Sequence, residues 1–124
     1  MKLDELQLKI MKVLWAKETA SVGEIKAILE SERSFAITTI STVLQRLYKK
    51  GVVDYHKEGR QYIYKALVTE KETQTSMTSN LLDQLFGGKS SVLVNHLLET
   101  DGIETEELEQ LKQLIEKAQN KKNN

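Results

Sequence analysis

The feature that most constrains the fold is a change of pattern at Gly51, where a helical repeat gives way to two strand-like segments. Apolar residues at helical spacing predict a helix over residues 36–50, and a glycine directly after it suits the end of a helix. The segments 52–56 and 62–68 are rich in β-branched and aromatic residues, and a short polar stretch with a glycine separates them. This pattern predicts a β-hairpin after the helix.

Two further helices are predicted before this one. Asp4 can cap a helix whose apolar residues recur at helical spacing as far as Trp15. After a short connection at 19–20, the stretch Ser21–Glu24 has the spacing of a capping box and predicts the start of a second, short helix. Three helices followed by a hairpin describe a winged helix-turn-helix DNA-binding domain over residues 1–68, in a chain that is mainly α with a small β-hairpin.

Residues 69–124 are predicted to form a helical dimerisation domain. The stretch Thr69–Glu72 resembles a capping box and opens a helix that two glycines end after Phe86. Further helices are expected over 91–99 and from about Thr105. Because about 50 helical residues bury a poor core alone, their apolar side chains are expected to pair with a second copy of the chain. The expected dimerisation residues are Met77, Leu81, Leu82, Leu85, Val92, Leu93, Leu97, Leu108, Leu111, Leu114 and Ile115.

The charges are distributed unevenly, although they sum to zero over the chain. Residues 36–65 carry six basic and two acidic side chains, whereas residues 98–118 carry two basic and seven acidic ones. A basic first half joined to an acidic second half indicates one module that binds a polyanion and a separate module that binds a partner.

The predicted helix 36–50 has one apolar and one polar face. The apolar face consists of Ile37, Ile40, Val43, Leu44 and Leu47, all within about 60° of Ile40 on a helical wheel. Threonine, glutamine and lysine side chains cluster on the opposite side, where short polar groups can meet base edges and cations can reach phosphate or guanine. The apolar face is therefore expected to lie in the core, and the polar face is expected to read double-stranded operator DNA.

The hairpin is expected to act as a wing that grips the DNA backbone or an adjacent minor groove, because its tip carries Lys57 and Arg60. Taken singly, the helix and the hairpin have an alternative interpretation: a solvated amphipathic helix beside an ordinary hairpin. The order of these features along the chain favours DNA binding. The expected DNA-binding residues are Thr38, Thr39, Ser41, Thr42, Gln45, Arg46, Lys49, Lys50, Lys57 and Arg60.

Composition excludes several other classes of protein. The chain has no cysteine and two histidines, which excludes disulfides, thiolate metal sites and structural zinc, and no cofactor is expected. The charged N-terminus does not resemble a signal peptide and no apolar run approaches about 20 residues, so we expect a cytoplasmic protein without membrane contact. No phosphate-binding loop, nucleophile elbow or apolar carboxylate pair is present, so no enzymatic activity is expected.

Several stretches of the chain carry the motifs of one known family. These stretches are residues 10–15 (IMKVLW), 39–51 (TISTVLQRLYKKG), 57–60 (KEGR), 62–64 (YIY), 82–88 (LDQLFGG) and 106–111 (EELEQL). The chain resembles the penicillinase repressor family, also called BlaI/MecI/CopY, over nearly its whole length. The resemblance implies a homodimer that binds palindromic operators upstream of resistance or copper-handling genes and blocks transcription. It also implies that the C-terminal helices interlock between subunits.

The family has two known routes of release, and the chain departs from both. In the antibiotic-responsive branch, a membrane-anchored sensor linked to a protease triggers cleavage at an Asn-Phe pair in the dimerisation domain. The corresponding region here reads VNHLL over 94–98, so Asn95, His96 and Leu97 form the candidate cleavage region without the usual pair. The cysteine pairs of the copper branch are absent, which excludes copper release through thiolates. Residues 35–38 read FAIT where many members carry Trp-Ser-Pro-Lys, so a different operator sequence is expected.

We therefore expect a homodimeric transcriptional repressor that reads palindromic operator DNA through helix 36–50 and the wing, and that controls resistance or stress genes. One alternative is a winged-helix module for protein contacts without DNA reading, which predicts a hydrophobic outer face on that helix. The polar residues there argue against it. A second alternative, an enzyme with a DNA-binding appendage, lacks both catalytic residues and room. Release by proteolysis, by a small ligand or by another protein stays open at this point.

Overall fold

The computed structural model describes residues 1–100 and 102–123. Its internal contacts divide the chain into two compact units, Met1–Thr78 and Ser79–Asn124. The domain boundary expected between residues 68 and 69 stays a prediction. The first turns of the helix that follows this point belong to the first unit.

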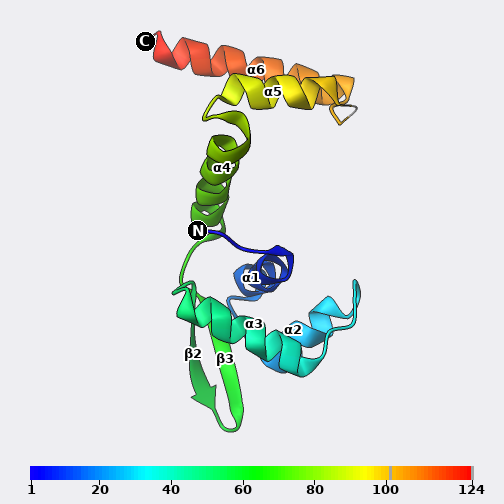
Figure 1. Cartoon of the computed structure of the whole chain (residues 1–124), viewed down its shortest axis with the longest axis vertical. Helices are drawn as coiled ribbons and strands as arrows, with labels where there is room; N and C mark the ends of the chain where they lie inside the picture. The colour runs from blue at the N-terminus through cyan, green and yellow to red at the C-terminus, as the bar shows by residue number, and fades with distance from the viewer. Residues whose placement is uncertain (101, 124) are drawn as a thin grey trace. The chain divides into compact units, whose positions relative to one another are not determined.

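The first unit consists of three helices, a three-stranded antiparallel sheet and the start of a fourth helix (Figure 1). The strand order is β1-β3-β2, and β2 and β3 form the hairpin that the sequence predicts. A mainly α fold with a small β-sheet is thereby confirmed. The elements are α1 (Glu5–Lys17), β1 (Thr19–Ser21), α2 (Val22–Leu29), α3 (Ile37–Lys49), β2 (Val53–Glu58) and β3 (Gln61–Ala66).

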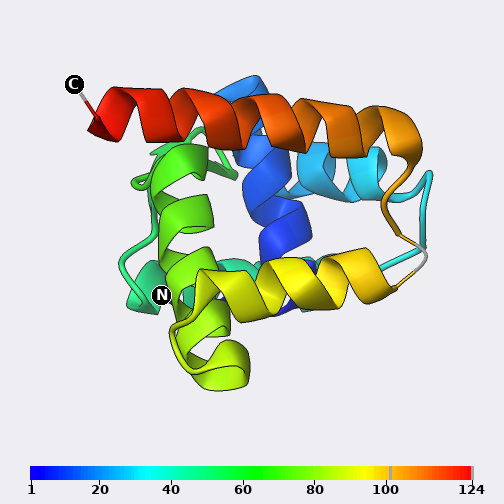
Figure 2. The ribbon, with the colours of Figure 1, turned by 90° about the horizontal axis from the view of Figure 1, so that it is seen from above.

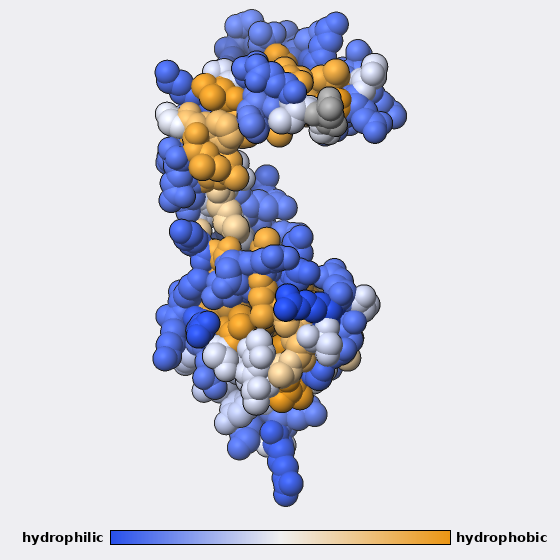
Figure 3. Space-filling model, turned by 45° about the vertical axis from the view of Figure 1, so that its right-hand side comes forward, coloured by the Kyte–Doolittle hydropathy of each residue, from blue (hydrophilic) through white to orange (hydrophobic). Residues whose placement is uncertain are grey.

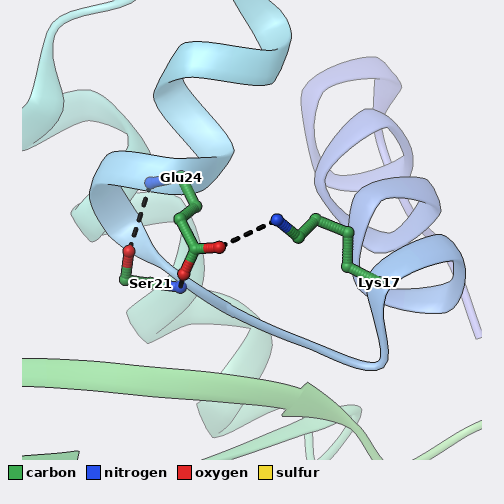
Figure 4. Close-up of polar contacts among 3 residues, drawn as sticks. All are labelled: Lys17, Ser21 and Glu24. Carbon is green, nitrogen blue, oxygen red and sulfur yellow. Dashed lines mark hydrogen bonds and ion pairs between the residues drawn. The ribbon is translucent and has the colours of Figure 1, made fainter.

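Side-chain caps fix the start of the first two helices. The Asp4 carboxylate accepts a hydrogen bond from the Gln7 backbone N–H at 2.8 Å, and Gln7 Oε1 accepts one from the Asp4 N–H at 3.1 Å. At the start of α2, the Ser21 hydroxyl accepts a bond from the Glu24 N–H at 3.2 Å (Figure 4). The Glu24 carboxylate in turn accepts bonds from the Ser21 N–H at 3.1 Å and from Lys17 Nζ at 2.8 Å. Both helices therefore begin where the sequence predicts.

Strand β1 lies where the sequence analysis expected only a short connection. It runs antiparallel to β3, with Ala20 opposite Tyr64 and buried to 1% exposure. Three residues are too few to show an alternation of apolar and polar side chains. The strand is therefore defined by the partner that the fold brings beside it.

The core of the first unit lies between the three helices and the sheet. Its largest fully buried apolar side chains are Ile10, Met11, Leu14, Ile25, Ile40, Leu44, Leu47 and Val53. Ile37 was expected on the buried face of α3, yet 50% of this residue is exposed, and this expectation is wrong. Ile37 is the first residue of α3, and a helical wheel gives the direction of a side chain but not how far the neighbouring elements extend. The other four residues of that face are buried as predicted.

The first turns of α4 (Glu70–Phe86) pack onto the core of the first unit. The Thr69 hydroxyl accepts a hydrogen bond from the Glu72 N–H at 3.0 Å, which is the predicted cap. Thr73 is buried to 2% exposure, and Met77 is half-buried against the same core. Met77 was expected to face a second copy of the chain, and the structure places it within the first unit instead.

The second unit contains the rest of α4 together with α5 (Ser90–Glu99) and α6 (Thr105–Lys122). Figure 2 shows α5 and α6 as antiparallel helices, in yellow and in orange to red. No described residue after Thr78 is buried, so this unit has no core of its own.

Apolar side chains of the second unit lie at the surface along all three helices (Figure 3). Leu82, Leu93 and Leu111 are half-buried. The other expected dimerisation residues of this unit are exposed, namely Leu81, Leu85, Val92, Leu97, Leu108, Leu114 and Ile115. Over residues 1–100 and 102–123, no helix is both long and apolar enough to cross a membrane.

Candidate nucleic-acid interface

Helix α3 presents a polar face on a backbone that its apolar face anchors in the core. Ile40, Leu44 and Leu47 on the inner side have 0% exposure. Ser41 on the flank is half-buried. The exposed residues expected to contact DNA are Thr38, Thr39, Thr42, Gln45, Arg46 and Lys49. The structure thus brings these side chains together on one outward side of a fixed helix.

The hydroxyl of Thr42 is committed to its own helix as a donor. It donates a hydrogen bond to the Thr38 carbonyl at 2.8 Å. A hydroxyl has one proton and two lone pairs, so the Thr42 oxygen can still accept a bond from a partner. Thr42 can therefore accept a hydrogen bond from a donor on a base edge. To donate to an acceptor on a base edge, its side chain would first have to rotate.

Lys50 is the expected DNA-binding residue that the structure places elsewhere. Its ammonium donates hydrogen bonds to the Lys2 carbonyl at 2.7 Å and to Gln7 Oε1 at 2.9 Å. Gln7 lies in the first turn of α1, and Lys2 precedes that helix. Lys50 is the residue after the last turn of α3, so its direction depends on tertiary neighbours rather than on the helical repeat. Lys50 is exposed and both acceptors are uncharged, so its contact with DNA stays a prediction.

The wing ends in a tight turn that exposes its cationic residues. Glu58 and Gln61 are the last paired residues, so Gly59 and Arg60 form a two-residue loop. Gly59 has φ 62°, a left-handed conformation that glycine adopts without steric cost. The Lys57 ammonium lies 5.7 Å from the centre of a neighbouring tyrosine ring, and Arg60 is exposed at the tip.

Three of the four lysines of α1 and α2 form ion pairs with acids, and Lys12 of α1 forms none with the described residues. Ion pairs join Lys9 to Glu32 at 2.6 Å, Lys17 to Glu24 at 2.8 Å, and Lys26 to Glu30. Each of these lysines lowers the pKa of its partner carboxyl below the ordinary value. In the part of the chain that the structure describes, no ion pair involves Arg46, Lys49, Lys57 or Arg60. Among the described residues, these four cations of α3 and the wing are therefore not neutralised by an acidic partner.

Three tyrosines beside this surface were missed by the sequence analysis. Tyr48 of α3, Tyr55 of β2 and Tyr62 of β3 form a row of touching rings. Strand alternation already places Tyr55 and Tyr62 on one face of the hairpin, which was a usable signal. The contact with Tyr48 depends on how α3 packs against the hairpin. Among the described residues, no group of three or more histidine or acidic side chains could hold a metal ion.

Comparison with known families fits this arrangement. Residues 3–117 match the family described as penicillinase repressor. The chain belongs to the penicillinase repressor family. The predicted resemblance is thereby confirmed, and it covers both units of the structure.

Relatives in the penicillinase repressor family match this chain along most of its length. The penicillinase repressor of Bacillus licheniformis is 30% identical over 120 residues, which is 97% of this chain and 94% of that protein. The solution structure of the DNA-binding domain of the repressor BlaI has a TM-score of 0.52 and 32% identity, and covers 57% of this chain and 87% of that one.

A further solved structure shows a related repressor with DNA. It is the solution structure of the monomeric form of Bacillus licheniformis BlaI in complex with the blaP half-operator. Its TM-score is 0.50 at 32% identity, over 58% of this chain and 88% of that one.

Proposed function

We propose that this chain is a transcriptional repressor that binds palindromic operator DNA as a homodimer, with α3 and the β2–β3 wing of each copy on one half-site. The observation that carries the proposal is that α3 and the wing expose polar groups together with four cations that form no ion pair among the described residues. Membership of a family of repressors supports it. A relative solved with a half-operator supports DNA as the partner.

In this proposal α3 lies in the major groove. Thr38 and Gln45 are of the length that meets base edges, whereas Arg46 and Lys49 reach phosphate or guanine. Lys57 and Arg60 on the wing contact the backbone beside the groove. Base contacts specify the sequence, and phosphate contacts fix the position of the helix on the duplex.

The second unit supplies the contact between two copies. Its helices expose leucine, valine and isoleucine side chains and bury none of their described residues. A surface of this kind is stabilised when a second copy covers it. Dimerisation links two half-site contacts, so the second copy binds DNA at a high effective concentration.

For release, we propose that a sensor-linked protease, if it acts on this repressor, cuts between Val92 and Leu98. Asn95, His96 and Leu97 lie inside α5, where Asn95 Nδ2 donates to Glu99 Oε1 at 3.3 Å, so the helix must open locally before a protease can bind it. One cut would separate α6 from the rest and remove the linkage between half-sites. Immunoblots of cells before and after cell-wall antibiotic stress test this. A fragment ending near His96 supports cleavage, and derepression with the full-length chain contradicts it.

DNA fragments that co-purify with the protein test the main proposal. Sequencing should show enrichment of a palindromic motif whose two halves are read by the two copies. Recovery of protein partners with no enriched DNA would instead support the alternative of a winged-helix module for protein contacts. A protein in which Arg46 and Lys49 are both replaced by alanine is the matched control, and it should lose the enrichment.

A further inference from the structure

The outer half of the wing has little support from the sheet. Strand β1 pairs with β3 only at residues 63–65. Residues 57–62 therefore have only each other as strand partners, in a two-stranded ribbon. Such ribbons are marginally stable in water without further packing. The cations at the tip of the wing need another source of order if they are to meet DNA at a fixed place.

A row of three tyrosines runs from α3 across the supported part of the hairpin to Tyr62 in the unsupported part. The ring centres of Tyr48 and Tyr55 are 5.0 Å apart with an interplanar angle of 62°, and those of Tyr55 and Tyr62 are 5.3 Å apart at 85°. Both are edge-to-face arrangements, which aromatic pairs favour. The Lys57 ammonium lies 5.7 Å from the Tyr62 ring centre, at the outer end of the row.

The row is anchored at its middle ring and exposed along its length. The Tyr55 ring centre lies 5.5 Å from that of Tyr64, which is buried to 6% exposure in the core. Tyr48, Tyr55 and Tyr62 are 47%, 39% and 46% exposed. These three rings contact one another, so they connect α3 to the wing outside the main core.

We propose that Tyr48, Tyr55 and Tyr62 are positioning residues that hold the wing at a fixed orientation to α3, so that Lys57 and Arg60 reach the DNA backbone when α3 lies in the groove. This inference rests on the proposed DNA binding. Groups that are ordered before binding lose less conformational entropy on binding, which raises affinity without adding a contact. The rings act here through their packing and not through their hydroxyl groups.

The first experiment measures order of the wing in the full-length protein without DNA. Steady-state 15N heteronuclear NOE values at residues 57–61 should fall clearly in Tyr55→Ala and stay near those of the parent in Tyr55→Phe, which keeps the ring. Lys65→Ala is the matched control, because it changes an exposed side chain on the opposite face of the hairpin. Parent-like values in Tyr55→Ala would overturn the proposal. Tyr62→Ala, at the outer end of the row, gives the same test if Tyr55→Ala does not fold.

The second experiment measures affinity for the enriched duplex from the fragment sequencing. Tyr55→Ala should bind about tenfold more weakly and Tyr55→Phe within about twofold of the parent. Lys57→Ala should weaken duplex binding when it is made in the parent protein. In Tyr55→Ala the same substitution should cause little further loss of affinity, because the wing contact is already lost. Equal losses in Tyr55→Phe and Tyr55→Ala would overturn the proposal in favour of hydroxyl contacts to phosphate. If the parent binds no DNA, the proposed function fails, and the NOE measurement still decides whether the tyrosines order the wing.

Discussion

At the residue scale, DNA affinity should depend on Arg46 and Lys49, because no ion pair in the described part of the chain uses their charge. We expect Arg46→Ala and Lys49→Ala each to weaken operator binding without lowering the midpoint of thermal unfolding. A residue that contacts phosphate should reduce the slope of log affinity against log salt by about one, and a residue that contacts a base should mainly relax specificity. Lys12→Ala removes an equal charge from α1 and is the control. Unchanged binding in both α3 variants would remove α3 from the interface.

The backbone conformation of Glu18 should lower the free energy of unfolding. It follows α1 with φ 71° and ψ −48°, and it is the only described non-glycine residue with a positive φ. Glycine adopts such a conformation without strain, so Glu18→Gly should raise the free energy of unfolding by about 0.5–1 kcal/mol. Ala16→Gly, inside the same helix, should lower it by about 1 kcal/mol. Urea unfolding measures both, and a less stable Glu18→Gly would contradict the assignment of strain.

At the scale of one element, the start of α2 should make stability depend on pH. Lys17 beside the Glu24 carboxyl, followed by the Ser21 N–H, holds the pKa of Glu24 below its ordinary value of 4.5. A carboxyl with a lower pKa in the folded state stabilises that state above the unfolded pKa, and this contribution is lost as pH falls through the folded pKa. The stability contributed by Glu24 is therefore expected to be lost at pH values below 4.5.

Glu24→Gln tests this dependence because glutamine can still accept from Ser21 but cannot ionise. Its free energy of unfolding should vary less with pH in that acidic window than that of the parent, as measured by urea unfolding at several pH values. Lys17→Met should flatten the profile partly, and the double variant should match Glu24→Gln. Parallel profiles for the parent and Glu24→Gln would contradict the role of this carboxyl.

At the scale of the whole molecule, operator binding should require the apolar surface of the second unit. Leu114 on α6 is 61% exposed, so a charge there costs the single chain little and destabilises a dimer that covers it. Leu114→Asp should therefore sediment as a monomer at micromolar concentration, with unchanged helix content by circular dichroism and weaker operator binding. Gln113→Asp adds the same charge beside it and is the control. A monomeric parent protein would refute the proposed assembly.

Local patterns were enough to predict most of the fold and the family. The caps at Asp4, Ser21 and Thr69 were readable because a capping box acts within four consecutive residues. The two faces of α3 were readable because the helical repeat fixes which side chains share a side. The family could be predicted because its motifs are distributed over both halves of the chain.

Tertiary structure decided the features that depend on distant neighbours. Strand β1 exists because β3 lies beside it, and Lys50 bonds to Gln7 and the Lys2 carbonyl because the fold brings them within its reach. Met77 packs with the first unit although its spacing suited a second copy of the chain, since periodicity shows that a side chain is apolar but not which surface covers it. The tyrosine row depends on the packing of α3 against the hairpin. The sequence by itself determined the elements and their faces, because these follow from the geometry of the backbone over a few residues, whereas only the folded chain decided which faces meet.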